Sequence, residues 1–413
     1  MNKVLQKIKS SSFIQLTSWT LLSQLIVFLL SPISTRLFTP SQFGLYTLAT
    51  SVVSMVVPVI SLKFDSLIVT EKEEHSAYLA MLVSYISIPI ISIVTIIIYY
   101  IYGVYSYIDI SIFEIIIIFL ILIVTGISNI GVSYANRLSL FNEIGKYNFI
   151  RSLFQNVILI IVGFIGFGVK GMLVSMLLGN FFGFSRIMKN KPKIKGKTII
   201  VEDIKDYFKK NIDLLKYSFP AHFVNSFSYT ILNFLIVALY DTEVFGYYSL
   251  AFRVLGLPLM VITQNMSRIF FKESSEEWNN LKSYAHSLKK SVMILVSVSI
   301  PMLIVLVLFS PTIFSVIFGK SWEMTGVFVQ ILAPMFAIRL IVSSLMTIFI
   351  VIQKQRVELL FQNMFLISSI TVFIVSKILN LSIIYFLTGI SISYSIIYII
   401  IFIYIFRRRN QYD

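Results

Sequence analysis

Residues 43–49 read Phe43-Gly-Leu-Tyr-Thr-Leu-Ala49, and residues 245–251 repeat them as Phe245-Gly-Tyr-Tyr-Ser-Leu-Ala251. Five of the seven positions are identical, at an offset of 202 residues. A second pair, Leu153-Phe-Gln-Asn156 and Leu360-Phe-Gln-Asn363, is identical at the nearly equal offset of 207 residues. Two matches in the same order and at nearly the same spacing predict a duplicated chain with two similar halves.

The segments around these repeats are apolar enough to cross a membrane. Of the 413 residues, 57% are hydrophobic and 13% are charged, which is about half of the charged share in soluble proteins. This composition excludes a soluble enzyme and a disordered chain. A membrane helix needs about 20 apolar residues, and backbone groups in lipid must be satisfied within the segment. Twelve helical spans are predicted, at 13–35, 43–69, 77–101, 112–135, 152–168, 171–188, 217–239, 245–270, 290–309, 324–351, 358–378 and 381–406.

The positive charges test this topology. The net charge is +15, from 34 Lys and Arg against 19 Asp and Glu. With the N-terminus in the cytoplasm, 28 of the 34 fall in cytoplasmic segments, 4 fall outside, and Arg253 and Arg339 remain within spans. Membrane proteins generally carry more Lys and Arg in their cytoplasmic loops than in their outer loops, and this chain shows the same alternation. The basic balance therefore indicates membrane orientation, with both termini cytoplasmic, and gives no indication of nucleic-acid binding.

We therefore predict an all-α polytopic membrane protein, with twelve transmembrane helices in two parallel six-helix halves around a central cavity. The predicted domains are an N-terminal bundle (1–188), a cytoplasmic linker (189–216) and a C-terminal bundle (217–413). Two parallel halves around a central site are a common plan of secondary transporters, which work by alternating access. The linker combines a basic loop with an amphipathic helix that is predicted to lie in the membrane interface. The simpler alternative is that it only connects the halves.

Several motifs resemble those of polysaccharide-export membrane proteins, the Wzx-type flippases of the MATE-like exporter superfamily. They extend over nearly the whole chain. They are Thr39-Pro-Ser-Gln-Phe-Gly-Leu-Tyr46, Leu62-Lys-Phe-Asp-Ser-Leu-Ile-Val69, Asn136-Arg137 with Phe141, Gln264-Asn-Met-Ser-Arg-Ile-Phe-Phe271, and Gly319-Lys-Ser-Trp322 followed by Gln330-Ile-Leu-Ala-Pro334.

The resemblance implies a flippase that moves undecaprenyl-pyrophosphate-linked oligosaccharides, such as O-antigen or capsule repeat units, across the bacterial inner membrane. It implies a lipid-linked glycan as substrate, and a polysaccharide polymerase and a chain-length regulator as partners. Two other functions stay open. One is a small-molecule or drug exporter on the same scaffold, and the other is a membrane enzyme of polysaccharide assembly.

Two arginines within spans are the leading candidates for substrate binding. Arg339 lies near the middle of the tenth predicted span and Arg253 in the outer half of the eighth. A charge at such depth usually faces the bundle interior or a wet cavity, and the arginine fork suits phosphate. The alternative for both is an internal ion pair or a helix carbonyl that fixes packing.

A second group lies near the cytoplasmic end of the second predicted span. Lys63 is a candidate for contact with the pyrophosphate, or it extends to the lipid headgroups. Asp65 is predicted to pair with Arg137 or Arg151 in an inner gate, or to be the site of H⁺ or Na⁺ coupling. Because residues two apart on a helix do not face each other, Lys63 and Asp65 are not expected to be partners.

Signals of catalysis are absent from the sequence. The chain has no cysteine, and its three histidines are isolated from one another. No phosphate-binding loop with a Lys-Ser or Lys-Thr ending occurs. We therefore expect no enzyme, no catalytic residues, no metal site and no cofactor, with energy supplied by an ion gradient or a partner.

Overall fold

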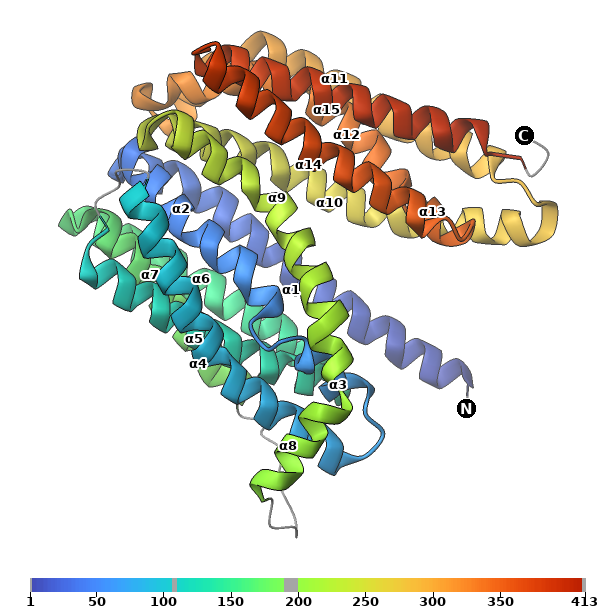
Figure 1. Ribbon diagram of the computed structural model, residues 1–413. Helices are drawn as coiled ribbons and strands as arrows, with labels where there is room; N and C mark the ends of the chain where they lie inside the picture. The colour runs from blue at the N-terminus through green and yellow to red at the C-terminus, as the bar shows by residue number, and fades with distance from the viewer. Residues whose placement is uncertain (1, 106–109, 189–199, 411–413) are drawn as a thin grey trace. The chain divides into compact units, whose positions relative to one another are not determined.

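The computed structural model describes residues 2–105, 110–188 and 200–410. Helices make up nearly all of this part of the chain, and no strand occurs in it (Figure 1). The first helices are α1 (Asn2–Leu37), α2 (Pro40–Val56), η1 (Val57–Val59), α3 (Phe64–Thr70), α4 (Glu74–Tyr105), α5 (Ile112–Arg137), α6 (Phe141–Ile165), α7 (Gly168–Ile187) and α8 (Val201–Lys210). They are followed by η3 (Leu214–Ser218), α9 (Phe219–Leu239), α10 (Thr242–Leu281), α11 (Ala285–Phe318), η4 (Lys320–Trp322), α12 (Glu323–Leu345), α13 (Ile348–Val351), α14 (Gln355–Ile378) and α15 (Ile383–Arg407). The predicted basic loop of the linker, residues 189–197, lies outside the described residues.

The chain is a multi-pass membrane protein, and the all-helical prediction is confirmed. Within the described ranges, ten helices are long and apolar enough to cross a membrane, judged by length and composition. The two remaining predicted positions hold α7, with 20 residues, and α9, with 21 residues. At a rise of 1.5 Å per residue each is about 30 Å long, the thickness of the hydrocarbon layer. The count of twelve spans stays a prediction.

The chain divides into two compact units, residues Met1–Phe234 and Leu235–Asp413, so that the boundary falls within α9. In unit 1, α5 packs against α4 and α7, and α6 packs against α7 and α1. In unit 2, α12 packs against α11 and α15, and α14 packs against α15 (Figure 1). The order of packing is therefore the same in both units. The third predicted span of each half packs against the fourth, and the sixth packs against the fourth and the fifth. The predicted boundaries at 188 and 216 stay a prediction.

The repeated motif supplies core residues in both units. Phe43 and Tyr46 on α2 are 2% and 4% exposed, and their counterparts Phe245 and Tyr248 on α10 are 0% and 2% exposed. Both helices begin with a side-chain cap. Thr39 Oγ1 accepts a hydrogen bond from the Gln42 amide, and Asp241 Oδ1 accepts one from the Val244 amide. Such caps satisfy donors that the first helical turn leaves free. The repeated residues therefore pack in the core of each unit, just after the capped start of a helix.

The prediction of one continuous helix over residues 43–69 is wrong. α2 ends at Val56, and the chain turns through positive φ angles of 54° at Leu62 and 69° at Lys63 before α3 begins. Pro58 explains the break, because proline lacks an amide hydrogen and its ring clashes with the preceding turn. The expectation that Lys63 and Asp65 share one helix is therefore also wrong.

The eighth predicted span is longer than expected. α10 contains 40 residues, which is about 60 Å of helix against about 30 Å of hydrocarbon. Its polar C-terminal end therefore extends beyond the membrane. That end is joined to α11, because Glu277 accepts hydrogen bonds from the His286 and Ser287 amides at 3.0 and 2.8 Å.

The closest approach between α11 and α12 makes a testable prediction. A Cβ added to Gly326 would lie 2.6 Å from the Pro311 nitrogen and 2.6 Å from the Ser310 carbonyl oxygen, both backbone atoms. Gly326→Ala is expected to lower the free energy of unfolding by about 2 kcal/mol, because backbone cannot rotate out of the way. The control is Gly256→Ala on α10, whose added Cβ meets no atom within 4 Å. The measurement is the melting temperature of each variant in detergent. Equal melting temperatures of Gly326→Ala and Gly256→Ala would contradict this close packing.

Candidate functional site

Arg339 lies in the second half of α12, the helix that packs against α10, α11 and α15 in unit 2. Its side chain is half-buried. The guanidinium carbon lies 5.6 Å from the ring centre of Phe252 on α10 and 5.4 Å from that of Phe336 on α12. These two rings meet edge to face, with centres 5.3 Å apart. Both distances are within the range of a cation–π interaction, so the rings hold the cation in place.

The polar neighbours of Arg339 are uncharged. Its charge acts on the hydroxyls of Tyr248 on α10 and Tyr394 on α15. Tyr394 shares a hydrogen bond of 2.6 Å with Ser369 on α14. In the described part of the chain, no carboxylate forms an ion pair with Arg339. An internal ion pair, one of the alternatives drawn from the sequence, is therefore not present there.

Arg253 follows Phe252 on α10, but its side chain is exposed. Successive side chains on a helix point about 100° apart, so Arg253 and Phe252 lie on different faces. A joint role of Arg253 and Arg339 in phosphate binding stays a prediction.

The break after α2 holds Lys63 and Asp65 in unit 1. Lys63 is half-buried, and its carbonyl oxygen accepts a hydrogen bond of 2.6 Å from the Ser66 hydroxyl. The carboxylate of Asp65 accepts one of 2.5 Å from the Ser61 hydroxyl. The charges of Lys63 and Asp65 both act on the imidazole of His222 near the start of α9. No local pattern predicts this grouping, because 157 residues separate Asp65 from His222.

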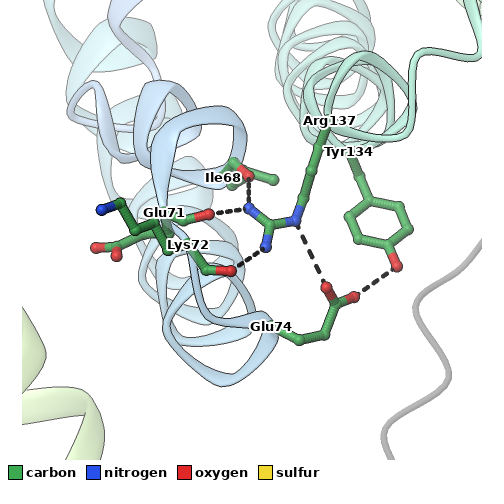
Figure 2. Close-up of polar contacts among 6 residues, drawn as sticks. All are labelled: Ile68, Glu71, Lys72, Glu74, Tyr134 and Arg137. Carbon is green, nitrogen blue, oxygen red and sulfur yellow. Dashed lines mark hydrogen bonds and ion pairs between the residues drawn. The ribbon is translucent and has the colours of Figure 1, made fainter. Parts of the chain in front are cut away.

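Arg137 stands at the centre of a polar network at the end of α5 (Figure 2). Its guanidinium donates hydrogen bonds to the carbonyl oxygens of Ile68 at 3.1 Å, Lys72 at 3.4 Å, and Glu71. Its Nε lies 3.5 Å from a carboxylate oxygen of Glu74. The guanidinium thus satisfies the last carbonyls of α3 and of the loop that leads into α4. We call these residues the Arg137 network.

Two tyrosines extend the Arg137 network. Tyr134, one turn before Arg137, donates a hydrogen bond of 2.9 Å to Glu74. Tyr207 on α8 donates one of 2.8 Å to Glu71. Burial, followed by the hydrogen bond to Glu71, raises the pKa of the Tyr207 hydroxyl, so this group stays a donor at neutral pH. The network therefore connects α3, α4, α5 and α8.

The apolar face of α8 packs on protein as well. Phe208 stacks on Phe64 of α3 with ring centres 5.5 Å apart, and Tyr207 lies 6.4 Å from the same ring. α8 thus docks on α4 and, through these rings, on Phe64 of α3. Its position in the membrane interface stays a prediction.

The predicted pairing of Asp65 with Arg137 or Arg151 is also wrong. Arg137 binds Glu74 and backbone carbonyls, and Asp65 binds Ser61. Arg151 is half-buried on α6, where its carbonyl oxygen faces Gly179 and its Cβ faces Gly183 of α7. Among the described residues its side chain forms no ion pair. Ser61 is four residues from Asp65, a spacing at which side chains meet locally, whereas Arg137 is held by partners from α3 and α4.

The chain was compared with known protein families and structures. The family model described as "Polysaccharide biosynthesis protein" matches residues 33–326. This match confirms the resemblance drawn from the motifs. No curated protein sequence matches the chain.

Solved structures share the fold. One is described as "Lipid II flippase MurJ, inward closed conformation", with 16% sequence identity and a TM-score of 0.69 over 95% of this chain and 87% of that chain. Another is an outward-facing "multidrug resistance MATE family transporter of the MOP superfamily", with 14% identity and a TM-score of 0.50 over 95% and 93% of the two chains. At these identities the likeness shows a shared fold.

Proposed function

Because the chain belongs to the polysaccharide biosynthesis protein family, we propose that it is a flippase for undecaprenyl-pyrophosphate-linked oligosaccharides, such as O-antigen or capsule repeat units. The likeness to a lipid II flippase supports a lipid-linked glycan as the substrate. The transport step moves a charged pyrophosphate and a hydrated glycan past the hydrocarbon layer. It needs no covalent chemistry, so we propose no catalytic residue.

The observation that carries this proposal is Arg339, a half-buried cation within a membrane helix that has aromatic rings as its described neighbours. A charge within a span is costly and is retained where it acts on a substrate or faces water. Its fork forms bidentate hydrogen bonds with phosphate oxygens. The rings of Phe252 and Phe336 hold the guanidinium in place, and its fork is proposed to bind the phosphate oxygens.

The other candidate residues take roles in access. Lys63 and Arg253 are proposed to contact the phosphates as the substrate enters and leaves. The Arg137 network and Arg151 are proposed to hold the cytoplasmic gate of unit 1. Asp65, with His222 in its electrostatic range, is the proposed site of H⁺ or Na⁺ coupling. The repeat supports alternating access, in which two similar helical bundles move against each other.

The proposed setting is the bacterial cytoplasmic membrane, with both termini in the cytoplasm, as the distribution of Lys and Arg predicts. The partners proposed from the family resemblance are a polysaccharide polymerase and a chain-length regulator. A small-molecule exporter is the second candidate, because the fold is shared with a multidrug transporter.

Deletion of the gene tests the proposal. A flippase mutant is expected to accumulate a lipid-linked oligosaccharide on the cytoplasmic face of the membrane, measured by extraction and by protection from externally added glycan-cleaving enzymes. Accumulation of single repeat units on the outer face would contradict the proposal and indicate a polymerase. Drug sensitivity without any accumulation would contradict it in favour of an exporter.

A further inference from the structure

The C-terminal end of α15 forms a hollow that the transport proposal does not use. Its volume is about 450 Å³, and Phe402, Ile403, Phe406, Arg407 and Arg409 line it. All five residues belong to unit 2. The hollow therefore combines an apolar wall with guanidinium groups at the end of a membrane-spanning helix.

Contacts with the turn between α10 and α11 fix this end of the helix. The Tyr284 amide donates a hydrogen bond of 2.9 Å to the Arg409 carbonyl, and its hydroxyl donates one of 2.7 Å to the Ile405 carbonyl. Tyr284 is fully buried. Ser283 adds a hydrogen bond of 2.8 Å to the side chain of Asn410. The hollow is therefore held by tertiary contacts on its inner side.

The charge of the hollow is strongly positive. Arg407, Arg408 and Arg409 are consecutive, and the sequence contains no acidic residue from 382 to 410. None of the three forms an ion pair within the described residues. The guanidinium of Arg409 lies 4.0 Å from the ring centre of Phe406 and donates a hydrogen bond of 3.1 Å to the Phe406 carbonyl. This stacking holds one arginine against the apolar wall.

An exposed apolar stripe leads to the arginines. Residues on one face of α15 are 56%, 52%, 45%, 43% and 48% exposed, and they are Ile392, Ile396, Ile399, Ile403 and Phe406. They recur at alternating intervals of four and three residues, as one side of a helix requires. The stripe runs from Ile392 to Phe406, 15 residues and about 21 Å of helix, which exceeds the ~15 Å of one hydrocarbon leaflet. An acyl chain can lie along it while its headgroup meets the arginines.

We propose that this hollow binds an anionic phospholipid, with the headgroup phosphate on Arg407 and Arg409, the two arginines that line it, and an acyl chain along the α15 stripe. Arginine binds phosphate oxygens through two parallel hydrogen bonds, and basic groups at the membrane surface attract anionic lipids. The position of the arginines directly beyond the apolar stripe matches the order of headgroup and chain in a lipid. This site does not depend on the proposed transport function.

α8 provides a matched control. It also carries three basic residues, the exposed Lys205, Lys209 and Lys210. Three acidic residues on the same helix, Glu202, Asp203 and Asp206, offset their charge. Its aromatic residues Tyr207 and Phe208 pack on Phe64. Substitution of these lysines changes the net charge as much as substitution of the arginines, but at a surface with no exposed apolar stripe beside it.

Native mass spectrometry of the full chain in detergent micelles, titrated with phosphatidylglycerol, tests the proposal. The variant R407Q/R408Q/R409Q is expected to bind at least about tenfold more weakly, since each basic residue near an anionic surface contributes about fivefold. The variant R407Q/R408Q removes one of the two lining arginines and leaves Arg409 on Phe406. It is therefore expected to lose about half of that effect on a logarithmic scale. The variant K205Q/K209Q/K210Q is expected to bind as the wild type does.

Four results would overturn the proposal. The first is an equal loss of affinity for phosphatidylglycerol in the lysine and arginine variants, which would show that net charge alone causes the effect. The second is equally tight binding of phosphatidylethanolamine, which would remove the requirement for an anionic headgroup. The third is displacement by inorganic phosphate alone, because the site would then be a simple anion site. The fourth is stronger binding of undecaprenyl phosphate at the same arginines, which would make the hollow a site for the carrier lipid.

Discussion

Replacement of Arg339 by alanine is expected to abolish transport while the protein still inserts and folds. The substitution removes the cation that Phe252 and Phe336 hold in α12. Loss of charge-assisted hydrogen bonds to a phosphate costs about 3 kcal/mol, which corresponds to about a hundredfold loss of rate. Complementation of a deletion strain, scored by surface polysaccharide and by accumulation of the lipid-linked precursor, measures the effect.

Two further variants make this result specific. Arg339→Lys keeps the charge but loses the planar fork, so partial activity is expected. Arg356→Ala, at an exposed arginine in the first turn of α14, is expected to complement fully. Wild-type activity in Arg339→Ala would remove the phosphate-binding role. Loss of membrane-inserted protein in Arg339→Ala but not in Arg356→Ala would show that Arg339 acts on folding instead.

Substitution of Arg137 is expected to have the largest effect on stability. Arg137→Ala leaves the carbonyls of Ile68 and Glu71 without the guanidinium donor and breaks the ion pair with Glu74. The side chain of Arg137 is 12% exposed, so these carbonyls regain little contact with water. An unsatisfied buried polar group costs about 1–3 kcal/mol, and we expect a total loss of about 3 kcal/mol in the free energy of unfolding.

The measurement is thermal unfolding of the purified variants in detergent. Lys146→Ala is the matched control, because Lys146 pairs with Glu143 at 3.6 Å on a partly exposed surface, and such pairs contribute about 0–1 kcal/mol. Arg137→Lys is expected to fall between the two, since one ammonium group does not match the geometry of several carbonyls and a carboxylate. A melting temperature of Arg137→Ala equal to that of Lys146→Ala would contradict the structural importance of the Arg137 network.

The positions of the helices follow closely from hydropathy. The predicted span 112–135 is α5, Ile112–Arg137, and the predicted span 381–406 is α15, Ile383–Arg407. Agreement is poorer where polar residues continue a helix outside the membrane, as at the end of α10. Hydropathy reports the length of apolar sequence, whereas hydrogen bonding sets the length of the helix. The break at Pro58 shows the opposite case, a long apolar run that does not form one helix.

The candidate site was only partly accessible to sequence reasoning. A charge within an apolar run identifies Arg339, because its cost in a membrane is independent of the surrounding fold. Its aromatic neighbour Phe252 comes from another helix, 87 residues earlier, and no local pattern connects the two. Charge alone did not predict the partner of Arg137, since it equally allowed Asp65, Glu71, Glu73 or Glu74.

The amino-acid order alone was sufficient for a helical membrane protein, for its family and for the depth of Arg339, because these depend on hydropathy and local motifs. The partners of Arg137 and Tyr207 depended on how the helices pack, because ion pairs and hydrogen bonds require groups within a few ångströms and at the correct angle. Packing places Arg137 on Glu74 and on the carbonyl of Ile68, and Asp65 accepts its hydrogen bond from Ser61, four residues earlier.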